Sequence, residues 1–216
     1  MRVFYDVDTQ NDFMNKNGAL YVPGAESIKQ NLKKLTEFAR KNNIPIIGSV
    51  DRHFGTLEYK EREKELQRWG GPFPDHCMDG TQGAKKIEET SCDEIYIAHR
   101  LDNRVDETEL IRAIYKVFKD KRGKKGLFFE KQSYDVFTNP AFCAFFDIVK
   151  IREAVVYGVA TDYCVKAAVL GMQKRGIQCY VVVDAIKGVS PDTTRSALEE
   201  MVNAGAKFVT TKQVLK

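Results

Sequence analysis

The chain has 216 residues, 43% of them hydrophobic and 30% charged, and its formal net charge is +4. A chain of this length can bury a core of its own, so we expect one domain that spans residues 1–216. The small net charge gives no support for a nucleic-acid partner, and no apolar run is long enough to span a membrane. The five cysteines are an odd number without a CxxC pair, which is typical of reduced thiols in a cytoplasmic protein.

Strand and helix patterns alternate from the first residues onward. Residues 3–8 alternate as a strand that ends at Asp8, and this early start leads us to expect no signal peptide. Residues 25–42 have one apolar face and predict an amphipathic helix. A second buried strand is expected at residues 44–50, directly before Asp51.

A long connection follows this second strand. Residues 59–69 predict a short and strongly charged helix, whereas residues 70–80 contain too many glycines and prolines for regular structure. Long loops inside compact domains are usually functional, so we expect this connection to contribute to a site.

The rest of the chain continues the alternation. Further strands are expected at residues 95–98, 126–130, 155–159, 178–183 and 207–210. Helices are expected at residues 107–119, where Ile111 is among the residues expected to face inward, and at 141–146, 162–172 and 191–204. This order predicts an α/β fold with a mostly parallel sheet and helices on both faces.

Cys164 lies in the first turn of the helix after the central strand, with Thr161 or Asp162 as the N-cap. Ligands bind at this edge of open α/β sheets, and a helix N-terminus lowers the pKa of a thiol. A cysteine nucleophile also needs a base and a cation, which Asp8 and Lys131 supply if they lie at the same edge. The alternatives are a small core residue for Cys164, a turn residue for Asp8 and a surface position for Lys131.

A second group of residues has the chemistry of metal ligands. Asp51 and His53 follow the second strand, and His76 lies in the Pro-rich loop. Imidazole nitrogens and a carboxylate oxygen suit a divalent transition metal such as Zn²⁺. The third histidine, His99, has no such partner in the sequence, and we expect it to be structural.

Together these segments resemble the isochorismatase-like cysteine hydrolase superfamily, and most of all its nicotinamidases. The matching segments are residues 8–13, 18–24, 51–53, 73–77, 131 with 133–137, 158–165, and 184–186 with 190–192. They follow the family order over nearly the whole chain. The resemblance implies a three-layer α/β sandwich with a central, mostly parallel sheet of about six strands. It also implies a homo-oligomer.

The resemblance implies a catalytic triad of Asp8, Lys131 and Cys164. Cys164 would attack the carbonyl carbon of a small-molecule amide, Asp8 would carry the proton to the departing ammonia, and Lys131 would stabilise both charges. Water would then hydrolyse the thioester. In this family a cis peptide bond, here Val159–Ala160, directs the backbone N–H groups of Ala160 and Cys164 at the oxyanion.

The resemblance also implies that the divalent metal anchors a pyridine nitrogen. Asp51, His53 and His76 match this site, with Zn²⁺ as the first choice and Mn²⁺ or Fe²⁺ as alternatives. Many members have a second histidine where Tyr59 stands in this chain, and some relatives use a glutamate instead. Among the four glutamates of this loop we predict Glu65, because it lies nearest the Gly- and Pro-rich run; otherwise water completes the site. The four are Glu58, Glu61, Glu63 and Glu65.

Aromatic and aliphatic side chains are expected to form the wall of the pocket, which suits a flat ring. They are Phe13, Leu20, Phe73, Tyr134, Phe137 and Tyr163. For Phe137 an ordinary core position is an equal alternative. The segment after Lys131 differs from that of many nicotinamidases, so three other functions stay open. These are hydrolysis of another small amide, metal-free hydrolysis of a vinyl ether, and binding without catalysis.

Overall fold

A computed structural model describes residues 1–216, which build one sheet of seven parallel strands in the order β3-β4-β2-β1-β5-β6-β7. The mostly parallel sheet predicted from the sequence is therefore confirmed, with seven strands. The strands are β1 (Arg2–Val7), β2 (Ile46–Asp51), β3 (Asp93–Ile97), β4 (Lys125–Lys131), β5 (Glu153–Val159), β6 (Gln178–Lys187) and β7 (Lys207–Val209). The central strands are buried along almost their whole length because helices cover both faces of the sheet.

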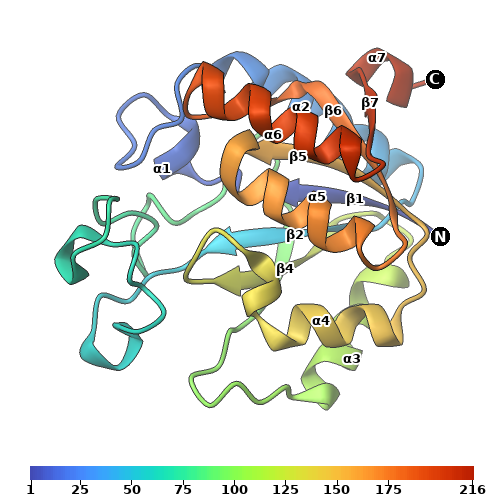
Figure 1. Cartoon of the computed structure of the whole chain (residues 1–216). Helices are drawn as coiled ribbons and strands as arrows, with labels where there is room; N and C mark the ends of the chain where they lie inside the picture. The colour runs from blue at the N-terminus through green and yellow to red at the C-terminus, as the bar shows by residue number, and fades with distance from the viewer.

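The helices form the two outer layers of the sandwich. They are α1 (Asn11–Met14), α2 (Lys29–Lys41), α3 (Glu107–Phe118), α4 (Pro140–Ile148), α5 (Lys166–Gln173), α6 (Pro191–Asn203) and α7 (Thr211–Val214). One core cluster contains the buried sides of α3 to α6, and the other contains α1, α2 and the 3-10 helix Ala25–Ile28. In Figure 1, α4, α5 and α6 lie in front of the sheet and α2 lies behind it.

The helix predicted between β2 and β3 does not form. In place of the charged helix expected at residues 59–69, the chain has only the 3-10 turns Leu57–Tyr59 and Gln67–Trp69. Its polar side chains bind backbone groups outside the segment: Glu63 accepts from Phe54 N, earlier in the same connection, and Arg62 donates to carbonyls of residues 99–101. These non-local bonds replace the helical ones.

In α3, Ile111 was expected to face inward but is 51% exposed. The buried stripe of α3 is formed by Leu110, Ala113 and Val117, which are spaced three and four residues apart on one side.

The carboxyl ends of the central strands meet at one edge of the sheet. In the parallel register Asp51 pairs with Lys131, and Val7 lies between Ser49 and Gly158. The residues that directly follow these positions are therefore neighbours in space. The connection between β2 and β3 runs beyond the same edge, where Figure 1 shows it in cyan to green at the left.

None of the helices is long and apolar enough to cross a membrane. All five cysteines are free.

Candidate active site

The structure brings Asp8, Lys131 and Cys164 together at the carboxyl edge of the sheet. Lys131 Nζ lies 3.0 Å from Asp8 Oδ2 and 3.5 Å from Cys164 Sγ. Asp8 and Lys131 are fully buried, and Cys164 is 8% exposed. Their burial excludes the two alternatives, an exposed turn residue for Asp8 and a surface position for Lys131.

The backbone conformation of Asp8, directly after β1, determines where its carboxylate points. Asp8 has a φ of 47°, in the left-handed region that aspartate tolerates better than most residues. Its Oδ1 accepts a hydrogen bond of 2.8 Å from Ser49 Oγ on the neighbouring strand β2. This bond leaves Oδ2 directed at Lys131.

Burial sets the proton affinities of the triad. It raises the pKa of Asp8, although Lys131 lowers it. Burial also raises the pKa of the Cys164 thiol well above its ordinary value, and Asp8 adds to this while Lys131 opposes it. Burial alone would lower the pKa of Lys131, but the carboxylates of Asp51 and Asp8 raise it. The lowered thiol pKa expected from the helix N-terminus is thus wrong, because desolvation of a buried thiolate outweighs the other effects.

The turn that carries Cys164 differs in detail from the expected helix start. The peptide bond between Val159 and Ala160 is cis, and a π-helical turn, Thr161–Val165, precedes α5. Neither Thr161 nor Asp162 caps this turn by its side chain, so the predicted N-cap is wrong. Ala160 and Cys164 both border the cavity described below.

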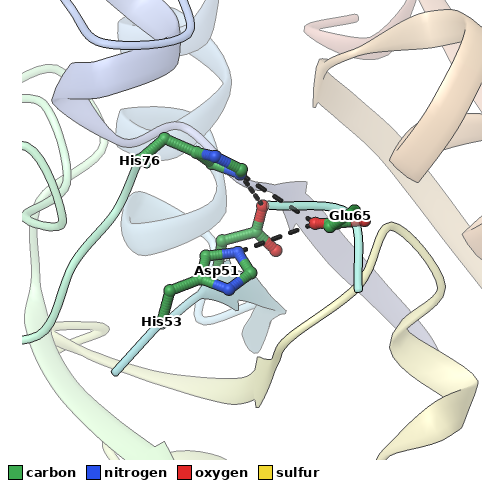
Figure 2. A group of neighbouring side chains, drawn as sticks. All are labelled: Asp51, His53, Glu65 and His76. Carbon is green, nitrogen blue, oxygen red and sulfur yellow. Dashed lines mark ion pairs between the residues drawn. The ribbon is translucent and has the colours of Figure 1, made fainter. Parts of the chain in front are cut away.

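Four potential metal ligands converge beside the triad. The ligand atoms of Asp51, His53, Glu65 and His76 all lie within 4.8 Å of one another. Figure 2 shows their side chains pointing toward one common centre. His53 Nε2 is 3.6 Å from Glu65 Oε1, and His76 Nε2 is 3.5 Å from Asp51 Oδ2. These distances are too long for good hydrogen bonds but suit ligands around an ion.

The hydrogen bonds of His53 and His76 show whether these side chains are free to bind a metal ion. Both ring nitrogens of His53 are buried without a hydrogen-bond partner. His76 Nδ1 lies 2.8 Å from the carbonyl oxygen of Pro74, which leaves Nε2 free to face the centre. A divalent cation at the centre would bind the free Nε2 of each ring through its lone pair. The Nδ1 of His76 is held by the Pro74 carbonyl, as is usual for a metal-binding histidine, and the Nδ1 of His53 lies 3.6 Å from Glu63 Oε1. The residues therefore fit a divalent metal ion.

Glu65 is the one glutamate of the loop that reaches this centre. Glu58 and Glu61 are exposed, and Glu63 accepts hydrogen bonds from the backbone of residues 54 and 55. Burial, together with the negative charge of Asp51, raises the pKa of Glu65 to about 7. The ring of Tyr59 stacks on Phe54, with centroids 4.1 Å apart, instead of joining the group.

Asp51 links the metal-binding group to the triad. Its Oδ1 pairs with Lys131 Nζ, and its Oδ2 faces His76. The side chain of Gln10 clamps its backbone: Gln10 Oε1 accepts from Asp51 N and Gln10 Nε2 donates to Asp51 O, both at 2.7 Å. Sequence reasoning gave Gln10 no role, because nothing in a polar loop shows which side chain folds inward.

An apolar cavity of about 80 Å³ opens above Cys164. Five of the six predicted wall residues line it: Phe13, Leu20, Phe73, Tyr134 and Tyr163. Asp51, Glu65 and His76 also border it. Four further lining residues were not foreseen: Tyr21, Val22, Val159 and Val189. Val159 ends β5 and the other three lie in loops, so only the tertiary structure brings them to one cavity.

Phe137 does not line this cavity, so its placement in the wall is wrong. Its ring lies 4.8 Å from that of Phe142 and packs closely against Gly171 of α5. The guanidinium of Arg175 covers its face at 4.2 Å. Phe137 instead belongs to the core between α4 and α5, which was the alternative for this residue.

The chain is similar to known proteins in both sequence and fold. A family model described as the isochorismatase domain matches residues 6–114 and 96–213. The chain is 29% identical over 218 residues to the nicotinamidase of Escherichia coli, covering 94% of this chain and 92% of that protein. It is 25% identical over 213 residues to the nicotinamidase/pyrazinamidase of Mycobacterium tuberculosis, covering 97% and 98%.

Among solved structures, the pyrazinamidase of Pyrococcus horikoshii in complex with zinc superimposes with a TM-score of 0.72 at 25% identity. The match covers 97% of this chain and 98% of that one.

Proposed function

This chain belongs to the isochorismatase family, and we propose that it hydrolyses nicotinamide to nicotinate and ammonia through a thioester on Cys164. One observation carries the proposal. Asp8, Lys131 and Cys164 lie beside a group of four potential metal ligands, one of which, Asp51, also pairs with Lys131. The nicotinamidase relatives and the zinc-containing pyrazinamidase support the same substrate class.

The raised pKa values determine how the attack would proceed. The Cys164 thiol is protonated at neutral pH, so it must lose its proton as the C–S bond forms. Asp8 receives this proton, and its own raised pKa makes it a stronger base than an ordinary aspartate. Asp8 then gives the proton to the amide nitrogen, which leaves as ammonia. Lys131 keeps its charge throughout and stabilises the carboxylate and the sulfur.

The second half of the reaction uses the same base. Asp8 takes a proton from water, and the oxygen attacks the thioester carbon. The C–S bond breaks, nicotinate forms, and the sulfur regains a proton. In both halves the backbone N–H groups of Ala160 and Cys164 donate to the carbonyl oxygen as it becomes negative. Loss of one such donor typically raises the barrier by roughly 3 kcal/mol.

Asp51, His53, Glu65 and His76 would hold the divalent metal, for which we propose Zn²⁺ because two imidazoles and two carboxylates suit it. The bound ion would supply a Lewis-acid contact for the lone pair of the ring nitrogen. The aromatic rings of Phe73 and Tyr163, 5.7 Å apart and nearly perpendicular, would enclose the flat ring beside it.

The ring nitrogen gives a sharp test of this proposal. Ammonia release is measured with nicotinamide, pyrazinamide, picolinamide and benzamide, before and after chelation. The first two have a nitrogen meta to the carboxamide carbon, whereas picolinamide has it only ortho and benzamide has none. We expect the first two to be hydrolysed, the other two to react poorly, and chelation to suppress the reaction. Equal rates for nicotinamide and benzamide would contradict the proposed role of the metal.

Two cysteine variants test the nucleophile. Cys164→Ala should abolish ammonia release, whereas Cys143→Ala, which lies away from the cavity and is partly exposed, should retain it. An active Cys164→Ala protein would exclude the thioester mechanism. Activity on none of these amides, with Cys164 still alkylated by iodoacetamide, would move the substrate to another small amide or to a vinyl ether. The single domain, the cytoplasmic location and the homo-oligomeric state expected above stay predictions.

A further inference from the structure

Asp162 is a buried carboxylate that the reaction described above does not use. It is 6% exposed, it lies two residues before Cys164 in the π-helical turn, and no lysine, arginine or histidine pairs with it. A buried carboxylate without a cation needs several hydrogen bonds to stay in place. Its partners come from the segment between β6 and α6 and from the first turn of α6.

The hydrogen bonds of Asp162 tie two segments together. Its Oδ1 accepts from Val189 N at 3.0 Å, and its Oδ2 accepts from Ser190 N at 3.3 Å. Thr193 Oγ1, in the first turn of α6, also donates to Oδ2. The turn of the nucleophile and residues 188–190 are therefore joined through one side chain.

Both segments joined by Asp162 reach the cavity. Val189 lines its rim, and Cys164 borders it from the other segment. Gly188 permits this close approach: a Cβ at this position would lie 3.1 Å from Asp162 Oδ1 and would overlap Thr194 Oγ1. A side chain at position 188 would therefore force Thr194 or Asp162 to shift.

We propose that Asp162 is a positioning residue that sets the orientation of Cys164 and the placement of Val189 at the same time. The inference rests on the proposed role of Cys164 as nucleophile. Asp162 touches no reacting atom; it acts through the turn and through the loop. A change of this side chain should therefore alter both the rate of the attack by Cys164 and the shape of the cavity rim at Val189.

The variant Asp162→Asn has the same shape but replaces one acceptor oxygen by an NH₂ group that faces the backbone N–H of Ser190. Loss of a buried hydrogen bond to a charged acceptor corresponds to a change of about 10- to 100-fold. We expect kcat for ammonia release to fall by about this factor and KM to rise. Alkylation of Cys164 by iodoacetamide, followed by intact-protein mass spectrometry, should slow about tenfold because the sulfur leaves its place beside Lys131.

Two controls separate positioning from simpler roles. Ser190→Ala removes the side chain that caps α6 at Thr193 N but keeps the backbone N–H that Asp162 binds. It should lower the melting temperature while leaving kcat, KM and the alkylation rate within about twofold of wild type. Val189→Ala should raise KM alone, because it alters only the rim.

Each result of these measurements either supports or overturns the positioning role of Asp162. Asp162→Asn with wild-type kcat and alkylation rate, or with losses that match Ser190→Ala, would overturn it. If Asp162→Asn does not fold, Thr193→Val should slow alkylation while Thr193→Ser, which keeps the hydroxyl, should restore it; equal rates in this pair would overturn the proposal. If the wild-type protein releases no ammonia from nicotinamide, the proposed function fails, and the alkylation rates still decide the role of Asp162.

Discussion

Replacing Glu65 by glutamine should have opposite effects on metal binding and on stability. The carboxylate lies 3.6 Å from His53 Nε2 and 4.0 Å from His76 Nε2, at the fourth corner of the group. Glutamine keeps the shape but removes the negative charge. We expect metal affinity to fall by about 10- to 100-fold, comparable to other changes close to a metal site.

Without metal, the same charge destabilises the fold. The pKa of Glu65 is raised from 4.5 to about 7 because the carboxylate is buried and lies near Asp51. Between these two pH values the folded protein binds more protons at this site than the unfolded chain, so stability falls as pH rises. The full shift corresponds to a loss of about 3 kcal/mol that is complete above pH 7. Chelated Glu65→Gln protein should therefore be more stable than chelated wild type at pH 8, with little difference at pH 4.

Urea unfolding of the chelated proteins at both pH values measures the stability effect, and titration with Zn²⁺ measures the affinity. Glu58→Gln, at an exposed position of the same loop, is the matched control and should change neither quantity. Unchanged affinity together with unchanged stability at pH 8 would refute the placement of Glu65 beside Asp51.

Three further substitutions test other contacts of the structure. Lys131→Met should abolish ammonia release and lower the free energy of unfolding by about 3–5 kcal/mol, since it leaves buried carboxylates unpaired; urea unfolding checks this, and an active variant would contradict it. Gln10→Ala should lower stability by about 1–3 kcal/mol and weaken Zn²⁺ binding, because the backbone of Asp51 loses both of its clamping bonds; unchanged Zn²⁺ affinity would argue against this. Lys86→Met, which leaves the buried Asp6 carboxylate without its cation, should cost about 3–5 kcal/mol but spare kcat, and a lost kcat in folded protein would show that this pair also supports the site.

The sequence determined the order of the elements and the chemistry of the site. Apolar periods of two or about 3.6 residues follow from the local geometry of strands and helices, so the parallel α/β sheet could be predicted without coordinates. Parallel strands place their carboxyl ends at one edge, which is why Asp8 and Lys131 could be expected near Cys164.

Only the tertiary structure decided which loop residues share the site. Glu65 and Glu63 lie two positions apart with the same side chain, yet one faces His53 Nε2 and the other binds backbone N–H groups of residues 54 and 55. The direction of each depends on contacts that exist only in the folded chain, as does that of Asp162, which binds the loop before α6. Burial, which raises the pKa of Cys164, likewise depends on every element packed around it. Local periodicity contains no information about such contacts, because they form only when segments far apart in the chain meet.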